Sequence, residues 1–347
     1  MESSVLLGLL LTFIAALLVV AFVHPQVMKF AKKRNIVDNP DARKLQRNPV
    51  PVMGGVAVFF GLIAGLCVAT IFLDINNLLP MFLAMSVMLC VGVADDVSSL
   101  SPWLRFVIEI IMVLMMMFVT DMSLNNLHGL WGYWDLPNWL ATPLTVVAVV
   151  GMINAINLID GVDGLSSGFC IMASIIFGVL FFKAGDILMI LICLLSIGAL
   201  LPFFFHNVFG VKTKMFIGDG GSLMMGVVMS SYVVTTISSG NICGQFYAGS
   251  ELGLVPFTLA VMCVPVFDTV RVMAMRIIRH TSPFHPDKTH LHHLFIELGF
   301  SHVGTTLSVL TLNLIVVILW YISYKCGASI STQFYVVMSS GILVTAL

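Results

Sequence analysis

Long apolar stretches, more than any single motif, limit how this chain can fold. Eleven of them lie near residues 4–23, 52–73, 81–94, 103–120, 142–158, 168–182, 187–205, 222–238, 252–270, 304–323 and 331–347. A helix that crosses a bilayer needs about 20 mostly apolar residues, whereas the strands of a membrane barrel read as short alternating segments. The sequence therefore predicts an all-α polytopic membrane protein of about ten or eleven transmembrane helices, in a single integral-membrane domain over 1–347.

Composition excludes the other broad classes. The chain is 59% hydrophobic and 10% charged, whereas soluble domains carry about 25% charged residues. A soluble fold is excluded because polar residues must cover its outside, and disorder is excluded because it requires low hydrophobicity. The formal net charge of −1 gives no reason to expect a nucleic-acid partner. We expect membrane lipids around the helices and leave a homodimer open.

The placement of the basic residues predicts the orientation. With eleven spans and the N-terminus outside, every Lys and Arg except Lys183 and Lys325 falls on one side of the membrane. Positively charged residues collect on the cytoplasmic side of membrane proteins. That side is therefore predicted to be cytoplasmic.

Acidic, amide and histidine residues gather in five short segments on the same side. These are residues 44–55, 94–96, 154–164, 206–222 and 282–295. The adjacent Asp95 and Asp96 directly follow an apolar run, so they repel one another where desolvation is costly. A metal ion or a basic ligand would offset that cost.

The segment NLIDGVDG is open to two interpretations. Asn157, Asp160 and Asp163 are spaced by three and share a face if the helix continues, but Asp-Gly pairs also form turns. In FIGDGGS, Asp219 or Ser222 could cap a helix, and the same geometry could present backbone N–H groups to a phosphate and a carboxylate to a cation.

The chemistry of these residues favours phosphoryl transfer. Carboxylate and amide oxygens suit Mg²⁺, with Mn²⁺ as an alternative, while basic and histidine side chains suit a phosphate or diphosphate. Three histidines in HLHH could also suggest zinc, but phosphate binding fits the other segments better. A transporter of a phosphorylated or acidic solute is the rival class. It would place polar residues near the bilayer midplane, where Glu109 and Asp268 come closest.

Five motifs carry a resemblance to a known family. They are VPVMGG at 50–55 after Pro49, ADD at 94–96, NAINLIDGVDGL at 154–165, FIGDGGS at 216–222 and SPFHPDKTHLHH at 282–293. On these motifs the chain resembles the polyprenyl-phosphate N-acetylhexosamine-1-phosphate transferases, membrane enzymes of the glycosyltransferase 4 type. The resemblance implies an active-site cleft on the cytoplasmic face, Mg²⁺ as cofactor, and residence in a bacterial cytoplasmic (inner) membrane. The partners it implies are a UDP-sugar and a polyprenyl phosphate lipid.

The resemblance also implies residue roles. Asp95 and Asp96 match the catalytic pair, Asp219 and Asn157 match the metal site, and the substrate-binding positions are Lys44, Arg47, Asp160, Asp163, Asn207, His290, His292 and His293. It leaves two chemical routes open, either direct attack by the lipid phosphate or a covalent phospho-sugar enzyme.

Two features bear on the branch of the family. The muramoyl-pentapeptide branch usually carries a lysine shortly after the aspartate pair, where this chain has Val97, Ser98 and Ser99. The histidine segment looks like that of the N-acetylglucosamine branch. We therefore expect transfer of N-acetylglucosamine-1-phosphate from UDP-N-acetylglucosamine to undecaprenyl phosphate with release of UMP, as the first membrane step of a cell-surface glycan pathway. The muramoyl-pentapeptide nucleotide or another UDP-sugar is the alternative donor.

Overall fold

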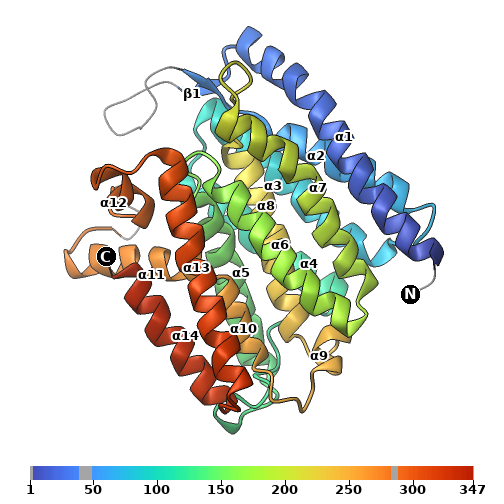
Figure 1. Ribbon diagram of the computed structural model, residues 1–347, viewed down its shortest axis with the longest axis vertical. Helices are drawn as coiled ribbons and strands as arrows, with labels where there is room; N and C mark the ends of the chain where they lie inside the picture. The colour runs from blue at the N-terminus through green and yellow to red at the C-terminus, as the bar shows by residue number, and fades with distance from the viewer. Residues whose placement is uncertain (1–2, 39–48, 283–287, 347) are drawn as a thin grey trace.

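The protein is a bundle of helices with one small sheet at one end (Figure 1). The computed structural model describes residues 3–38, 49–282 and 288–346. Its longest helices are α1 (Ser3–Lys33), α3 (Leu79–Ser98), α4 (Pro102–Thr120), α5 (Asn138–Leu158), α6 (Leu165–Ala184), α7 (Ile187–Phe209), α8 (Gly218–Ile237) and α13 (His302–Lys325). The shorter ones are α2 (Gly54–Ala69), α9 (Ile242–Phe246), α10 (Leu254–Val261), α11 (Cys263–Ile278), α12 (Leu291–Glu297) and α14 (Ile330–Thr345). Two 3-10 turns, η1 (Asn76–Leu78) and η2 (Leu130–Gly132), lie in the loops.

Each of the eleven predicted apolar stretches forms helix. Among the described residues, eight helices are long and apolar enough to cross a membrane, and α10 with α11 makes a ninth, bent span. The apolar helices α2 and α14 have 16 residues each, which is about 24 Å of helix against a hydrocarbon core of about 30 Å. The prediction of an all-α polytopic membrane protein is confirmed, and the chain is an integral membrane protein.

Helix α8 forms the centre of the bundle and α4 lies at its edge. In an 18-residue apolar stretch within Gly218–Phe246, which spans α8 and α9, 94% of the residues are buried, whereas 17% are buried in the corresponding stretch of α4. Close packing of α8 against α3 depends on glycine, because a Cβ atom on Gly92 would collide with the backbone of Gly220. The first turn of α8 therefore lies directly against the last turns of α3, where the aspartate pair is found.

The span predicted near residues 252–270 is broken. Helices α10 and α11 meet at Met262 with a bend of 76°, and Pro265 in the first turn of α11 lacks the N–H that would continue the ladder. Asn313 of α13 compensates: its Oδ1 accepts from Val264 N at 2.9 Å and its Nδ2 donates to Val261 O at 3.0 Å. Side chains from neighbouring helices commonly satisfy broken backbone in membranes. The break turns α11 across the end of the bundle (Figure 1).

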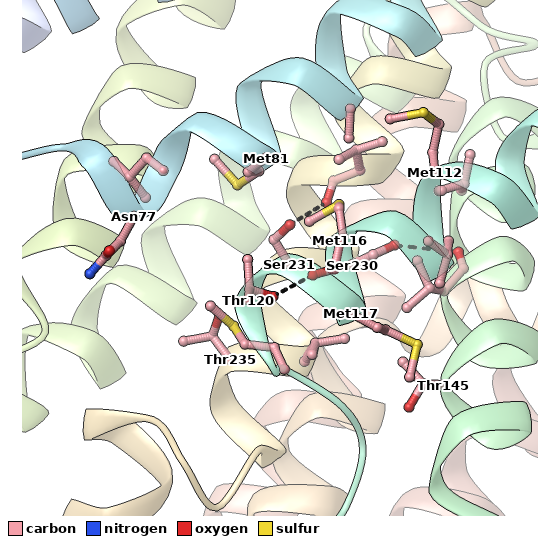
Figure 2. Close-up of a pocket in the computed structure, with 18 of the residues that line it drawn as sticks. Asn77, Met81, Met112, Met116, Met117, Thr120, Thr145, Ser230, Ser231 and Thr235 are labelled. Carbon is pink, nitrogen blue, oxygen red and sulfur yellow. Dashed lines mark hydrogen bonds between the residues drawn. The ribbon is translucent and has the colours of Figure 1, made fainter.

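A narrow apolar pocket of about 50 Å³ separates α4 from the centre of the bundle. Figure 2 shows Met112, Met116 and Met117 of α4 lining it together with Ser230 and Ser231 of α8. Both serine hydroxyls donate to carbonyls one turn back in their own helix, at 2.7 and 2.9 Å. The wall of the pocket therefore contains flexible methionine side chains, and its two serine hydroxyls are already hydrogen-bonded within α8.

The small sheet shows the structural role of the VPVMGG motif at residues 50–55. Strand β1 (Val37–Asp38) pairs antiparallel with β2 (Val50–Pro51). The chain after β2 then runs beside the FIGDGGS segment: Phe216 N donates to Pro51 O at 2.9 Å, and Gly55 N donates to Ile217 O at 2.7 Å. The motif therefore supports the start of α8 through backbone hydrogen bonds. Strand β1 and helix α12 lie at the same end of the bundle (Figure 1).

Candidate functional site

A cavity of about 500 Å³ opens at this end of the bundle. All five predicted polar segments contribute to its wall, through Val52, Asp96, the turn after α5, the start of α8 and His293. Segments that are far apart in sequence therefore form one site.

Asp95 and Asp96 have different partners in the structure. Asp96 lines the cavity, and its Oδ1 and Oδ2 accept the N–H groups of Asp219 at 3.1 Å and Gly220 at 3.4 Å. Asp95 lies outside the wall and binds Arg105 Nη1 at 3.1 Å and Leu100 N at 2.7 Å. Neighbouring residues on a helix point in different directions. Asp96 is therefore the member of the pair that faces a substrate in the cavity.

Neither Asp219 nor Ser222 caps α8, although capping was one of the two possibilities for FIGDGGS. The free N–H groups of the first turn are bound by the Asp96 carboxylate of α3, which is favourable at the positive end of a helix. Ser222 instead donates to Gly218 O at 3.1 Å. Because the capping group comes from another helix, the Asp219 side chain remains directed to the cavity.

Asp219 and Asn157 form a hydrogen-bonded pair at the cavity wall. Asn157 Nδ2 donates to Asp219 Oδ1 and to Ser222 Oγ, both at 2.8 Å. Asp219 Oδ2 lies 3.9 Å from Arg105 Nη1. Within the described chain, the side-chain oxygen Oδ1 of Asn157 accepts no hydrogen bond, so it is free to act as a ligand. The resemblance to the family assigned both residues to one metal site, and in the structure their side chains are in contact.

The helix does not continue through the NLIDGVDG segment, as a shared face would have required. Helix α5 ends at Leu158, and the chain turns before α6, with Gly164 at a φ of 77° that favours glycine. The turn still brings Asn157, Asp160 and Asp163 to the same cavity. Burial, followed by the charges of Asp219, Asp96 and Asp163, raises the pKa of Asp160 well above its usual range.

Asp163 is paired with two basic side chains. Lys214 Nζ donates to Asp163 Oδ2 at 2.6 Å, and His302 Nδ1 lies 2.8 Å from the same oxygen. Burial alone would raise the pKa of Asp163, but the hydrogen bonds and charges of His302 and Lys214 hold it below its usual value. This carboxylate is therefore ionised and holds two basic side chains beside the cavity.

The three histidines of HLHH have different surroundings. His290 Nδ1 lies 2.8 Å from Asp268 Oδ2, and Asp268 also accepts from Leu291 N at 3.1 Å, so α11 anchors the segment. His292 is buried against Gly161, and burial together with His293 and His290 lowers its pKa to about 3. Of the three, His293 is the one that lines the cavity.

The remaining predicted positions are Asn207, Lys44 and Arg47. Asn207 lines the cavity, but its Oδ1 accepts from Gly164 N at 2.6 Å and its Nδ2 donates to Met215 O at 3.0 Å. Its amide therefore braces the backbone of two neighbouring segments. Lys44 and Arg47 lie outside the described residues.

Four residues near the site were not singled out from the sequence as site residues. Arg105 in the first turn of α4 contacts Asp95 and Asp219, and it is also near Glu109 Oε1 at 3.7 Å and Asn154 Oδ1 at 3.4 Å. An Arg followed by Glu four residues later in an apolar helix is a signal that could have identified it. Lys214, His302 and Asp38 are single residues without such a pattern.

Glu109 and Asp268, from which a transporter interpretation would start, belong to the network of this site. Glu109 is fully buried and accepts from Asn154, beside Arg105. Asp268 binds the histidine segment. The polar residues therefore converge on one end of the bundle.

The residues present fit a magnesium ion bound with a substrate. In the described part of the chain, no three His, Cys, Asp or Glu side chains are already gathered as a ligand cluster. Mg²⁺ usually binds through one or two carboxylates together with substrate phosphates and water, so a preformed cage is not required. Burial is the main cause of the raised pKa of Asp160, and the charges of Asp219, Asp96 and Asp163 add to it, so a cation bound among these carboxylates would be stabilised.

The fold and the cavity define a polytopic membrane protein with an acidic cavity at one end of its helical bundle. Glycosyl transferase family 4 matches residues 78–237, a region that includes Asp96, Asn157 and Asp219. A probable undecaprenyl-phosphate N-acetylglucosaminyl 1-phosphate transferase of Bacillus subtilis (strain 168) is 31% identical over 310 residues, 89% of this chain and 82% of the relative. The chain belongs to glycosyl transferase family 4.

Two further relatives extend the similarity. An undecaprenyl-phosphate alpha-N-acetylglucosaminyl 1-phosphate transferase of Pasteurella multocida (strain Pm70) is 32% identical over 305 residues, 85% of this chain and 80% of the relative. The protein of the same name in Escherichia coli (strain K12) is 28% identical over 284 residues, 79% of this chain and 72% of the relative. The similarity thus covers most of the chain, well beyond residues 78–237.

Proposed function

We propose that this protein transfers N-acetylglucosamine-1-phosphate from UDP-N-acetylglucosamine to undecaprenyl phosphate and releases UMP, as the first membrane step of a cell-surface glycan pathway. The observation that carries the proposal is the convergence of Asp96, Asn157, Asp160 and Asp219 on one cavity at the end of a membrane-spanning bundle. The printed names of relatives that match most of the chain support the choice of donor and acceptor.

The proposal places the cavity on the cytoplasmic face of a bacterial inner membrane, with the N-terminus outside. The distribution of Lys and Arg residues supports this orientation. Arg105 lies in the first turn of the peripheral helix α4, most of which is not buried by the protein. A lipid acceptor can therefore bring its phosphate to Arg105 from the bilayer, while a soluble nucleotide enters the cavity.

Asp219 and the side-chain oxygen Oδ1 of Asn157 would hold Mg²⁺. When bound, the ion would offset negative charge on the diphosphate. The hydrogen bond from Asn157 Nδ2 fixes the Asp219 carboxylate at 2.8 Å, and Arg105 lies on the other side of that carboxylate at 3.9 Å. The chain's own residues thus position charged groups around the reacting phosphate.

We favour direct attack by the lipid phosphate. An oxygen of that phosphate forms a bond to the β-phosphorus of the donor, the bond from that phosphorus to the bridging oxygen breaks, and UMP leaves with the bridging oxygen. A phosphate monoester is largely ionised at neutral pH because its second pKa is about 6. A strong base is therefore unnecessary, and Asp96 would orient the substrates.

The hydrogen bonds of Asp95, Asp96 and Asp219 support this route over a covalent intermediate on one of these three residues. Asp96 accepts from two backbone N–H groups, Asp95 is paired with Arg105, and Asp219 accepts from Asn157. Such bonds orient a carboxylate and lower its reactivity as a nucleophile. Labelled sugar phosphate should not accumulate on the protein when the lipid acceptor is omitted, and its accumulation would refute the direct route.

The central experiment measures UMP released by purified protein supplied with undecaprenyl phosphate, Mg²⁺ and a panel of UDP-sugars. UDP-N-acetylglucosamine should be the preferred donor. The Asp219→Ala variant should lose Mg²⁺-dependent release, whereas Asp74→Ala, which changes an exposed loop aspartate, should retain it. Near-normal activity of Asp219→Ala would refute the metal assignment, and no release by the wild-type protein with any donor would refute the proposed function.

A further inference from the structure

Building on the proposed function, we propose that Lys214 and His302 form a subsite for the phosphate that stays on UMP, with Asp163 positioning both side chains. The chemical class of ligand is a nucleoside phosphate. Neither side chain is required to hold the metal. The subsite therefore adds a second point of contact to the donor, separate from Asp219 and Asn157.

Three separate segments build this subsite. Lys214 lies in the loop between α7 and α8, Asp163 in the turn before α6, and His302 at the first residue of α13. Lys214 Nζ and His302 Nδ1 contact the same Asp163 oxygen, at 2.6 and 2.8 Å. Thr306 Oγ1 donates to the backbone oxygen of Asp163 at 2.8 Å, which ties the turn to α13.

Both basic side chains retain hydrogen-bonding capacity after binding Asp163. A lysine ammonium has three donors, and a histidine ring has a second nitrogen. The side chains of Lys214 and His302 are 31% and 32% exposed. Lys214 also lies over the ring of Phe216, which lines the cavity together with Asp163 and His302. The pair is therefore fixed in place at the cavity and still accessible to a ligand.

The charge of the cavity explains why a diphosphate needs such a subsite. The carboxylates of Asp96 and Asp219, when ionised, would repel both phosphates of a donor. A metal at Asp219 would serve the phosphate that is transferred, next to Arg105 and the acceptor. The phosphate that leaves on UMP gains negative charge as its bond breaks, and a positioned lysine stabilises such charge.

Lys214, Asp163 and His302 could instead serve only to join three segments of the fold. The two roles differ in what they predict for related ligands. A phosphate subsite acts on UMP but not on uridine, which lacks the phosphate. A structural tie, once broken, weakens both ligands together because the whole nucleoside site is disturbed.

The test measures binding of UMP and of uridine to the full-length protein and its variants. Lys214→Met should reduce the preference for UMP over uridine by about tenfold or more, the usual effect of losing a charged hydrogen bond, and should leave uridine binding unchanged. His302→Gln should reduce the same ratio, and Lys214→Arg should restore much of it. Lys212→Met, two residues away and exposed, is the matched control and should match the wild type.

An unchanged UMP-to-uridine ratio in Lys214→Met and His302→Gln would overturn the subsite, and so would equal losses for both ligands. Transfer of labelled sugar phosphate to undecaprenyl phosphate by the wild-type protein is measured separately. If that transfer occurs and the ratio is unchanged, the subsite alone fails. If the transfer is absent, the proposed function fails, whatever the ratio shows.

Discussion

Replacing Asn157 with alanine tests how the site holds its metal. The change removes the donor that fixes Asp219 Oδ1 at 2.8 Å and also the free side-chain oxygen Oδ1 of Asn157. A hydrogen bond to a charged group contributes about 1.5–3 kcal/mol, which corresponds to roughly 10- to 150-fold in an equilibrium constant. Loss of groups that orient a metal ligand typically costs about 10- to 100-fold in metal affinity or activity. We therefore expect the half-saturating Mg²⁺ concentration to rise at least about tenfold.

The assay is UMP release at saturating donor and acceptor over a range of Mg²⁺ concentrations. Ser222→Ala is the matched control, because it removes the second partner of Asn157 and leaves the bond to Asp219 in place. It should shift the Mg²⁺ requirement much less. If Asn157→Ala shows the wild-type Mg²⁺ curve while its maximal rate falls, then Asn157 acts on the substrate and the metal assignment is wrong.

Two further predictions concern stability in detergent. Asn313→Leu leaves Val264 N–H and Val261 C=O unpaired at the break between α10 and α11, at a cost of about 1–3 kcal/mol each. The thermal midpoint should fall, whereas the exposed Gln26→Leu should leave it unchanged. His292 has a folded pKa of about 3 against 6.5 for a free histidine, so the stability it contributes is present above pH 6.5 and lost as the pH falls. The free energy of unfolding should drop by about 2 kcal/mol between pH 7 and pH 5, and an equal drop in His292→Gln would refute this explanation.

Most of the fold could be predicted because a bilayer imposes few constraints on a chain, and each constraint acts on the local sequence. A stretch of apolar residues long enough to cross the bilayer must become helix, since its backbone has no water to bind. The stretches predicted at 103–120 and 304–323 correspond to α4 and α13. The break at Met262 could not be predicted, because it depends on Asn313, about fifty residues later, to satisfy the open backbone.

The same distinction applies to the site, where some features could be predicted from local sequence and others depend on tertiary contacts. Its acidic, amide and histidine residues were recognisable because such groups are scarce in this chain and gather in a few short segments at the ends of apolar stretches. Their individual tasks were not, because those tasks depend on partners from other helices. Asp96 and Asp95 are adjacent in sequence, yet one caps α8 and the other binds Arg105. Similarly, Asp163 was predicted to bind substrate, and the fold shows that it contacts Lys214 and His302.

By itself, the sequence determined that the chain is a helical membrane protein with a polar site at one end of its bundle. The cost of burying backbone and charge in lipid acts on each segment separately, so local composition is sufficient for that conclusion. Tertiary structure alone decided which carboxylates face the cavity and which basic residues accompany them. Hydrogen bonds and ion pairs act over about 3 Å between segments that are far apart in the chain, and their partners become known only when the helices pack.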